Sequence, residues 1–174
     1  MKRHNSRILA MMTLYQYDII EHSKLKDILE EDKIKEIATY SEIEDNSEGF
    51  DVDESLYNSL VNGVLTNLEE VDKLISSNLV KWPLDRLSFV DRAILRLAAY
   101  EMKFTNTPKN VVIDEALLIS ADYADTDDYP AKKFNNKVLD SIKESLNAKL
   151  VVFLWKRASP IITAARPVTI APRP

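Results

Sequence analysis

The chain has 174 residues, no cysteine and a formal net charge of −5, with 45% hydrophobic and 29% charged residues. This balance is typical of a folded globular protein, and the missing thiols exclude disulfides, thiol catalysis and cysteine-ligated zinc. No apolar run is long enough to span a bilayer and no signal-peptide core follows the N-terminus, so we expect a cytoplasmic protein without a membrane segment. The presence of only two glycines favours a helical fold with few tight turns.

Apolar residues recur at helical spacing in the first half of the chain, and no segment alternates as a strand does. The pattern predicts a first helix over about residues 2–21 and a second over about 23–43, followed by an acidic linker at 44–49. A long helix is then predicted from about residue 53 to 80. It is expected to end at Trp82-Pro83, because a residue that precedes proline is pushed out of the α region.

The second half of the chain predicts three further helices. Ser88 is expected to cap a helix over about residues 89–104, with its hydroxyl accepting the amide of Asp91. This helix is apolar on three sides, which predicts a central place in the fold. Another helix is predicted over about 108–123, and the last domain helix over about 130–146. The predicted fold class is therefore all-α, a compact bundle of about seven helices whose neighbours are antiparallel.

The C-terminal part of the chain differs in composition from the rest. Residues 150–174 hold four of the seven prolines, four basic residues and no acid, which gives them a charge of +4 and leaves −9 for residues 1–149. We therefore expect 1–149 to form the domain and 150–174 to form a flexible, basic, proline-rich tail. The exception is the apolar run LVVFLW at 150–155, which is predicted to extend the last helix or cover a core edge, and which is prone to aggregate where exposed.

Side chains that commonly carry catalysis or bind metals are isolated in this sequence. His4 and His22 lie far apart without an H-E-x-x-H pattern, which argues against a protein-ligated zinc site. The chain has no glycine-rich phosphate loop and no nucleophile elbow, so we expect no enzyme, no metal and no cofactor. Asp72 and Asp140 are expected to form salt bridges on helix surfaces.

Five stretches of the sequence together resemble the NusB family of transcription antitermination factors. They lie at 7–16, 61–72, 82–101, 108–116 and 133–140, in the order and spacing of the family. The third stretch is the most specific and reads W-x-L-x-R-L-x-x-V-D-R-A-I-L-R-L-A-A-Y-E. The resemblance covers nearly all of residues 3–146, whereas the tail from Leu150 onward has no counterpart in it.

This resemblance implies a compact all-α fold of two packed helical halves and a protein without enzymatic activity. It implies binding of the boxA element of nascent ribosomal-type RNA, as a heterodimer with NusE, a small-subunit ribosomal protein. The resulting complex helps RNA polymerase to read through terminators. We therefore expect boxA-type RNA, NusE and the RNA polymerase antitermination complex as partners, and a homodimer as a further state of the chain.

An acidic domain needs a local cluster of positive charge to bind RNA. Lys2, Arg3, His4 and Arg7 lie within two turns at the N-terminal end of the first helix, which predicts such a cluster. Tyr15 follows two turns after Arg7 and is a candidate to stack on a base of single-stranded RNA. Its apolar helix face leaves a place in the core as the alternative.

The resemblance adds Lys133 and Phe134 to the predicted RNA surface, although the spacing of Phe134 also fits the core. Two features depart from the family pattern. Lys137 stands where the family has a glycine, which predicts altered helix packing at that point. The N-terminal arm holds fewer arginines than is usual in the family, which predicts a lower affinity for RNA.

Asp91 and Arg92 are the predicted partner-binding residues. Asp91 caps its own helix, and by the resemblance it also accepts an arginine of the partner protein. Arg92 and Arg96, one turn apart, either face the partner or pair within the domain with Glu101 or Asp114. For these two arginines we favour pairing within the domain.

Two other functions stay open. The chain resembles the RNA-binding domain of an rRNA cytosine methyltransferase, but it leaves no room for a cofactor-binding domain. It is alternatively a helical protein-interaction module or homodimer whose RNA binding is weak or lost. The tail is either a basic arm that adds nonspecific RNA affinity or a segment without function.

Overall fold

The structure, a computed structural model, describes residues 1–20, 51–80, 82–126 and 130–162. Within these ranges it contains only helices, and the predicted all-α class is confirmed. The elements are α1 (Lys2–Ile19), α4 (Glu54–Thr66), α5 (Leu68–Ser76), the short 3-10 helix η2 (Leu84–Arg86), α6 (Phe89–Phe104), α7 (Lys109–Tyr123) and α8 (Ala131–Ile162). The predicted helix at 23–43 and the acidic linker lie outside the described residues. None of the described helices is long and apolar enough to cross a membrane.

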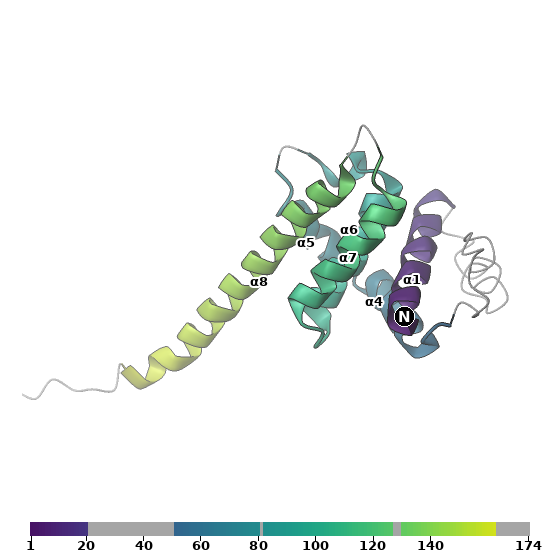
Figure 1. Ribbon diagram of the computed structural model, residues 1–174. Coiled ribbons are helices and arrows are strands. Elements are labelled where there is room, and N and C mark those ends of the chain that lie inside the picture. Colours follow the sequence, from purple (N-terminus) through teal and green to yellow (C-terminus); the bar gives the residue numbers. More distant parts are fainter. Residues whose placement is uncertain (21–50, 81, 127–129, 163–174) are drawn as a thin grey trace, which may run out of the picture.

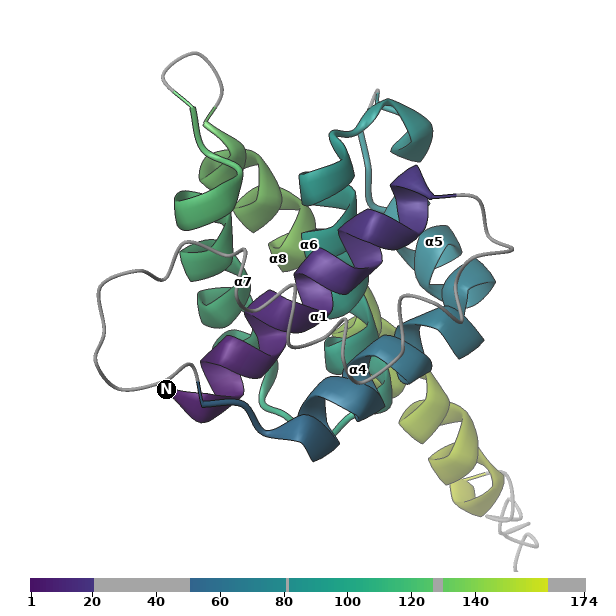
Figure 2. The ribbon, with the colours of Figure 1, turned by 90° about the vertical axis from the view of Figure 1, so that its right-hand side faces the viewer.

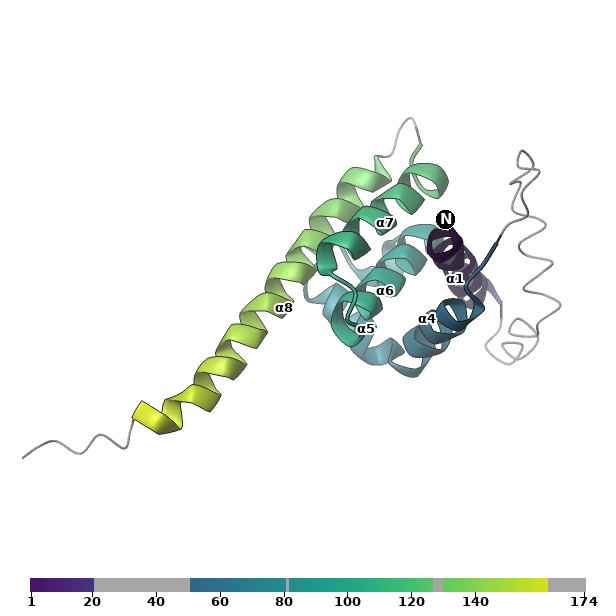
Figure 3. The ribbon, with the colours of Figure 1, turned by 60° about the horizontal axis from the view of Figure 1, so that its bottom comes forward.

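Helix α6 lies at the centre of the molecule, as its apolar surface predicts. The helices α1, α4, α5, α7 and α8 all pack against it (Figure 2). Ala93, Ile94, Leu95 and Ala99 of α6 are therefore almost completely buried. Helices α1 and α4 pack together on one side of α6, and α7 and α8 on the other (Figure 3). This arrangement gives the two packed halves that the resemblance implies.

The predicted long helix at 53–80 is wrong as a single element, because it divides into α4 and α5 at Asn67. The backbone amide of Asn67 donates to the carbonyl oxygens of Gly63 and Val64, and its side-chain Nδ2 donates to Gly63 O at 2.8 Å. Asparagine favours such local bonds over a continuing helix. Helix α5 ends at Ser76, before Trp82-Pro83, because Ser77 Oγ and Asn78 Nδ2 both donate to Leu74 O.

The N-terminus of α6 is capped as predicted. Ser88 Oγ accepts the amide of Asp91 at 3.0 Å and donates to Asp91 Oδ2 at 2.7 Å. The first bond satisfies a backbone amide that an uncapped helix end leaves without a partner, and the second joins the two side chains. Helix α7 likewise starts directly after Pro108, close to its predicted start.

Helix α8 runs without a break through the predicted domain boundary at residue 149. Its buried residues include Val138, Leu139 and Ile142, and Leu146 is the last that packs against the core. Beyond that point the helix projects away from the other helices (Figure 1). Residues 150–155 thus extend the last helix, which was one of the two predicted roles, and all six are more than half exposed. Residues 163–174 lie outside the described part of the chain.

Candidate nucleic-acid interface

Lys2 and Arg3 are exposed at the N-terminal end of α1. Lys2 Nζ lies 2.6 Å from Asp51 Oδ2, and both side chains are more than half exposed. Exposed ion pairs contribute little to stability, so a phosphate can replace Asp51 as the partner of Lys2. Within the described residues, the guanidinium of Arg3 has no ion pair. These two side chains are therefore open to an anionic ligand.

Arg7 lies beneath this exposed edge and is 5% exposed. Its Nε and Nη2 donate to the two carboxylate oxygens of Glu101 at 3.0 and 2.6 Å, and its Nη1 donates to Arg3 O at 3.2 Å. Burial opposes the charge, but the hydrogen bonds and charge of Glu101, with the charge of Glu115, outweigh it and raise the pKa of Arg7. The structure thus gives Arg7, predicted to bind RNA, a buried charge partner.

His4 is also partly buried, and its side chain contacts Glu115 of α7. His4 Nδ1 lies 2.7 Å from Glu115 Oε2, and each side chain is about one quarter exposed, at 26% and 24%. Arg7 Nη1 lies 3.8 Å from the same oxygen. The four predicted basic residues therefore differ, because Lys2 and Arg3 face solvent whereas His4 and Arg7 contact acids of α6 and α7.

A groove of about 610 Å³ opens beside Arg3. It lies between the start of α1, helix α4 and the loop that joins α6 to α7. The residues that line it are Arg3, Arg7, Leu56, Ser59, Leu60, Glu101, Thr105, Asn106, Thr107, Pro108, Val111 and Glu115. The sequence pattern does not reveal this groove, because its walls come from segments that are far apart in the chain.

Tyr15 lies toward the other end of α1, thirteen residues from Lys2 and about 20 Å along the helix. It is half-buried and packs against the core, and its ring meets the ring of Phe89 edge-on at 6.3 Å. Phe89 is 45% exposed, and the guanidinium of Arg92 lies over it at 5.0 Å from the ring centre. Sequence reasoning missed Phe89, although an aromatic residue outside the apolar stripe of α6 signals an exposed ring.

Lys133 and Phe134 lie on the first turn of α8. Lys133 is exposed, whereas Phe134 is half-buried and packs against the core. Phe134 also lines a smaller groove of about 190 Å³ together with Lys137. Lys137 is exposed, and the altered helix packing that we expected at this position stays a prediction.

Asp91 is completely buried and has no surface to offer a partner. Its Oδ2 accepts from Ser88 Oγ at 2.7 Å and its Oδ1 accepts from Asn135 Nδ2 at 2.8 Å. Asn135 Nδ2 also donates to Ser120 Oγ at 3.1 Å, while Asn135 Oδ1 is buried without a hydrogen bond. Asp91 thus links α6 to Asn135 of α8, and Asn135 links in turn to Ser120 of α7. A contact between Asp91 and a partner would require these helices to separate.

Arg92 and Arg96 pair within the domain, as favoured, but with different acids from those expected. Arg92 Nε donates to Asp18 Oδ2 at 2.7 Å, and Arg96 Nη1 donates to Asp18 Oδ1 at the same distance. Arg96 also binds both carboxylate oxygens of Asp72, which confirms that Asp72 forms a salt bridge. Asp140 likewise pairs with Lys143 at 2.9 Å.

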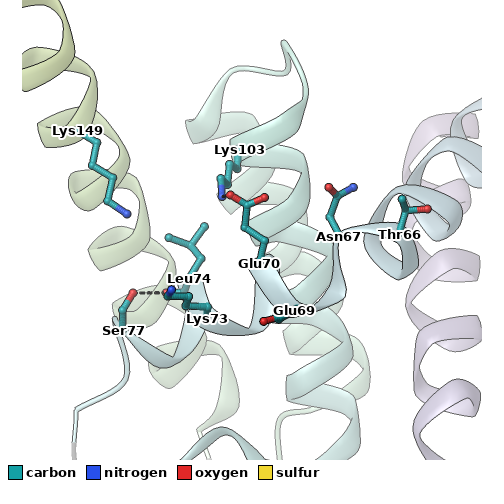
Figure 4. Close-up of a pocket in the computed structure, with 9 residues that line it drawn as sticks. All are labelled: Thr66, Asn67, Glu69, Glu70, Lys73, Leu74, Ser77, Lys103 and Lys149. Atoms are coloured by element: carbon teal, nitrogen blue, oxygen red, sulfur yellow. Dashed lines mark hydrogen bonds and ion pairs between the residues drawn. The ribbon is translucent and has the colours of Figure 1, made fainter.

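A second open groove, of about 630 Å³, lies between α5, the end of α6 and α8 (Figure 4). Lys73, Lys103 and Lys149 line it together with Glu69 and Glu70, and Lys103 pairs with Glu70. None of the residues predicted to bind RNA lines this groove, so we do not assign it to the nucleic acid. Among the described residues, no group of three histidine, aspartate or glutamate side chains is placed to hold a metal ion.

Comparisons with known proteins agree with the all-α fold and identify relatives of this chain. A sequence model described as the NusB family matches residues 4–144. The transcription antitermination protein NusB of Bacillus cereus strain B4264 is 40% identical over 147 residues, which is 84% of this chain and 100% of the relative. A protein of the same name from Bacillus anthracis strain CDC 684 has the same identity and coverage.

Solved structures are similar over the same region. NusB of T. maritima is 32% identical with a TM-score of 0.59, and the match covers 83% of this chain and 92% of that one. A chain from a complex of the antitermination factors NusB and NusE with double-stranded RNA is 26% identical with a TM-score of 0.61, over 83% of this chain and 97% of that one.

Proposed function

Because this chain belongs to the NusB family of transcription antitermination factors, we propose that it binds boxA-type RNA as a heterodimer with NusE and promotes read-through by RNA polymerase in rRNA operons. The observation that carries the proposal is the pair Lys2 and Arg3, which is exposed at the start of α1 beside an open groove. The chain is acidic overall, and such a local basic edge supplies the phosphate contacts that RNA binding needs. This function requires no catalysis.

The remaining predicted residues take different places in this proposal. Lys2 and Arg3 contact phosphates, and Tyr15 offers aromatic surface further along α1. Lys133 and Phe134, which the family resemblance adds, form a second part of the RNA surface at the start of α8. Arg7 acts by holding the backbone of Arg3 rather than by touching RNA.

The proposed NusE surface is the segment that leads into α6. Val80, Trp82 and Phe89 expose 74%, 51% and 45% of their surfaces there, and Arg92 lies over the ring of Phe89. Exposed aromatic side chains and arginines are the residues that most often dominate the energy of protein interfaces. In this proposal Phe89 therefore faces the partner, and Arg92, whose side chain is 12% exposed and pairs with Asp18, positions the Phe89 ring.

The test is a titration of fluorescently labelled boxA RNA with the full chain, alone and with NusE present. Few phosphate contacts come from this chain, so we expect weak binding alone and a clearly lower Kd with NusE. A scrambled RNA of the same length and composition is the control. Equal Kd values with and without NusE would contradict binding as a heterodimer. No binding in either case would favour the interaction module that has lost RNA binding.

A further inference from the structure

The groove beside Arg3 has the size and the polar groups to hold more than a backbone phosphate. We propose that it binds one nucleotide of the RNA, with the phosphate on Arg3 and a base that carries an amino group on Glu115. The inference rests on the proposed RNA binding and adds a base-selective position to it. Arg3 and Arg7, which line the groove, lie about 18 and 12 Å along α1 from Tyr15, so the groove is separate from the Tyr15 ring.

The rim of the groove supplies the phosphate contact. The guanidinium of Arg3 is exposed and, within the described residues, has no ion pair. Arg7 holds the carbonyl oxygen of Arg3 at 3.2 Å, which fixes the backbone from which this guanidinium extends. A guanidinium presents several donors in one plane and binds phosphate oxygens in pairs. Lys2 adds a second positive charge at the adjacent position of the chain.

The wall of the groove supplies a hydrogen-bond acceptor for the base. Glu115 Oε2 already accepts from His4 at 2.7 Å, whereas Oε1 has no partner among the described residues. The Glu115 side chain is 24% exposed, so solvent and ligands reach it. A carboxylate accepts from the amino group of cytosine, and it repels the carbonyl oxygen that uracil has at the same position. The free Oε1 therefore favours bases that carry an amino group.

The charges of the groove do not exclude an anionic ligand. Glu101 at its floor is 1% exposed and is paired with Arg7 through two hydrogen bonds. Glu115 is offset by His4 and by Arg7 Nη1 at 3.8 Å. Leu56 and Val111 add apolar surface for the face of a base. The ligand thus meets a cation at the rim and one open acceptor inside.

The test compares two nucleotides that have the same charge and nearly the same shape. Cytidine 5′-monophosphate and uridine 5′-monophosphate are titrated into the isotope-labelled full chain, and backbone amide NMR shifts are followed. We expect saturable shifts at Asn106, Thr107 and Val111, with cytidine monophosphate bound about fivefold more tightly. Inorganic phosphate alone is expected to shift the residues around Arg3 and not those around Val111.

Two variants separate the base contact from the phosphate contact. Glu115→Gln keeps an acceptor for His4 but adds a donor, so the preference for cytidine monophosphate should disappear. Arg3→Ala should weaken both nucleotides by the same factor. Glu144→Gln on α8, an exposed acid remote from the groove, is the matched control and should leave both affinities unchanged. Val111→Trp fills the groove at a position that is 45% exposed and should abolish the shifts without unfolding the chain.

The results distinguish this inference from the function on which it rests. Equal binding of both nucleotides, absence of saturable shifts in the groove, or a preference that survives Glu115→Gln would overturn the base-selective site. If boxA RNA still binds in that case, the proposed function stands and only the groove assignment fails. If boxA RNA does not bind the unmodified chain with NusE present, the function itself fails.

Discussion

The ion pair between Arg7 and Glu101 connects α1 to α6, and both of its side chains are almost completely buried. Both charged groups have left solvent, and each is stable there only because the other neutralises it. Glu101 is 1% exposed, so loss of the arginine would leave its charge buried without a counter-charge. The role of Arg7 is thus to fold and position the N-terminal end of α1.

Replacing Arg7 by methionine tests this role. Arg7→Met leaves Glu101 buried and unpaired, and we expect it to lower the free energy of unfolding by about 3–5 kcal/mol in urea denaturation. Arg7→Met with Glu101→Leu removes both charges and should recover most of that loss. The double variant also loses the hydrogen bond from Arg7 to the carbonyl oxygen of Arg3, so we expect RNA binding that is weakened but still measurable. A folded double variant whose RNA binding is abolished would return Arg7 to the RNA surface.

Gly63 is required where α4 approaches α6. A Cβ atom added at Gly63 would lie 2.1 Å from both Cζ and Oη of Tyr100, whose ring stacks on Phe104 at 5.3 Å. The ring would have to move, so Gly63→Ala should destabilise the fold by about 1–3 kcal/mol despite the better helix propensity of alanine. In a Tyr100→Ala background the same change should be neutral or stabilising. Thermal unfolding of the four variants measures this coupling, and equal effects in both backgrounds would rule out the contact.

At the scale of the elements, helix ends were predictable where a single local residue, a capping serine or a proline, sets them. Helix α6 has the predicted bounds because Ser88 caps it, and α7 starts close to its predicted position after Pro108. The division of α4 from α5 was missed because the apolar stripe continues across Asn67 and hides the break. At Asn67 the tendency of asparagine to bond to nearby backbone groups competes with the continuing apolar stripe. Periodicity alone does not show whether the helix continues or breaks there.

The outer part of α8 adds exposed apolar surface without adding core. Leu150, Phe153 and Leu154 each expose more than half of their surface, whereas the core contacts of the helix end at Leu146. Deleting residues 150–174 should therefore change the free energy of unfolding by no more than about 0.5 kcal/mol. It should lower self-association at high concentration, because large exposed apolar surfaces promote it.

Light scattering and urea denaturation of the full and shortened chains measure both effects. Phe153→Lys in the full chain is the matched control, since it removes apolar surface but keeps the tail. A large loss of stability on deletion would show that residues 150–174 belong to the folded domain. Unchanged scattering would show that the exposed run does not drive association.

At the scale of the whole molecule, the sequence was sufficient for the helical class and for the family to which the chain belongs. It was not sufficient for the side-chain pairs that join distant helices. Arg7 and Glu101 are 94 residues apart, and Arg96 meets Asp18 across 78. No local pattern couples such positions. Arg7 and Asp91 were therefore assigned to surfaces although the fold buries both.

The central claim is that RNA binds at the exposed start of α1, and the salt dependence of boxA RNA affinity tests it most directly. Each phosphate contact on single-stranded RNA contributes about −0.7 to the slope of log K against log salt. Lys2→Ala with Arg3→Ala should therefore make the slope about 1.4 less negative and weaken binding. The control removes two exposed lysines from the groove between α5, α6 and α8, Lys73→Ala with Lys149→Ala, and should leave the slope unchanged. An unchanged slope for the first pair, or an equal change for both pairs, would contradict the claim.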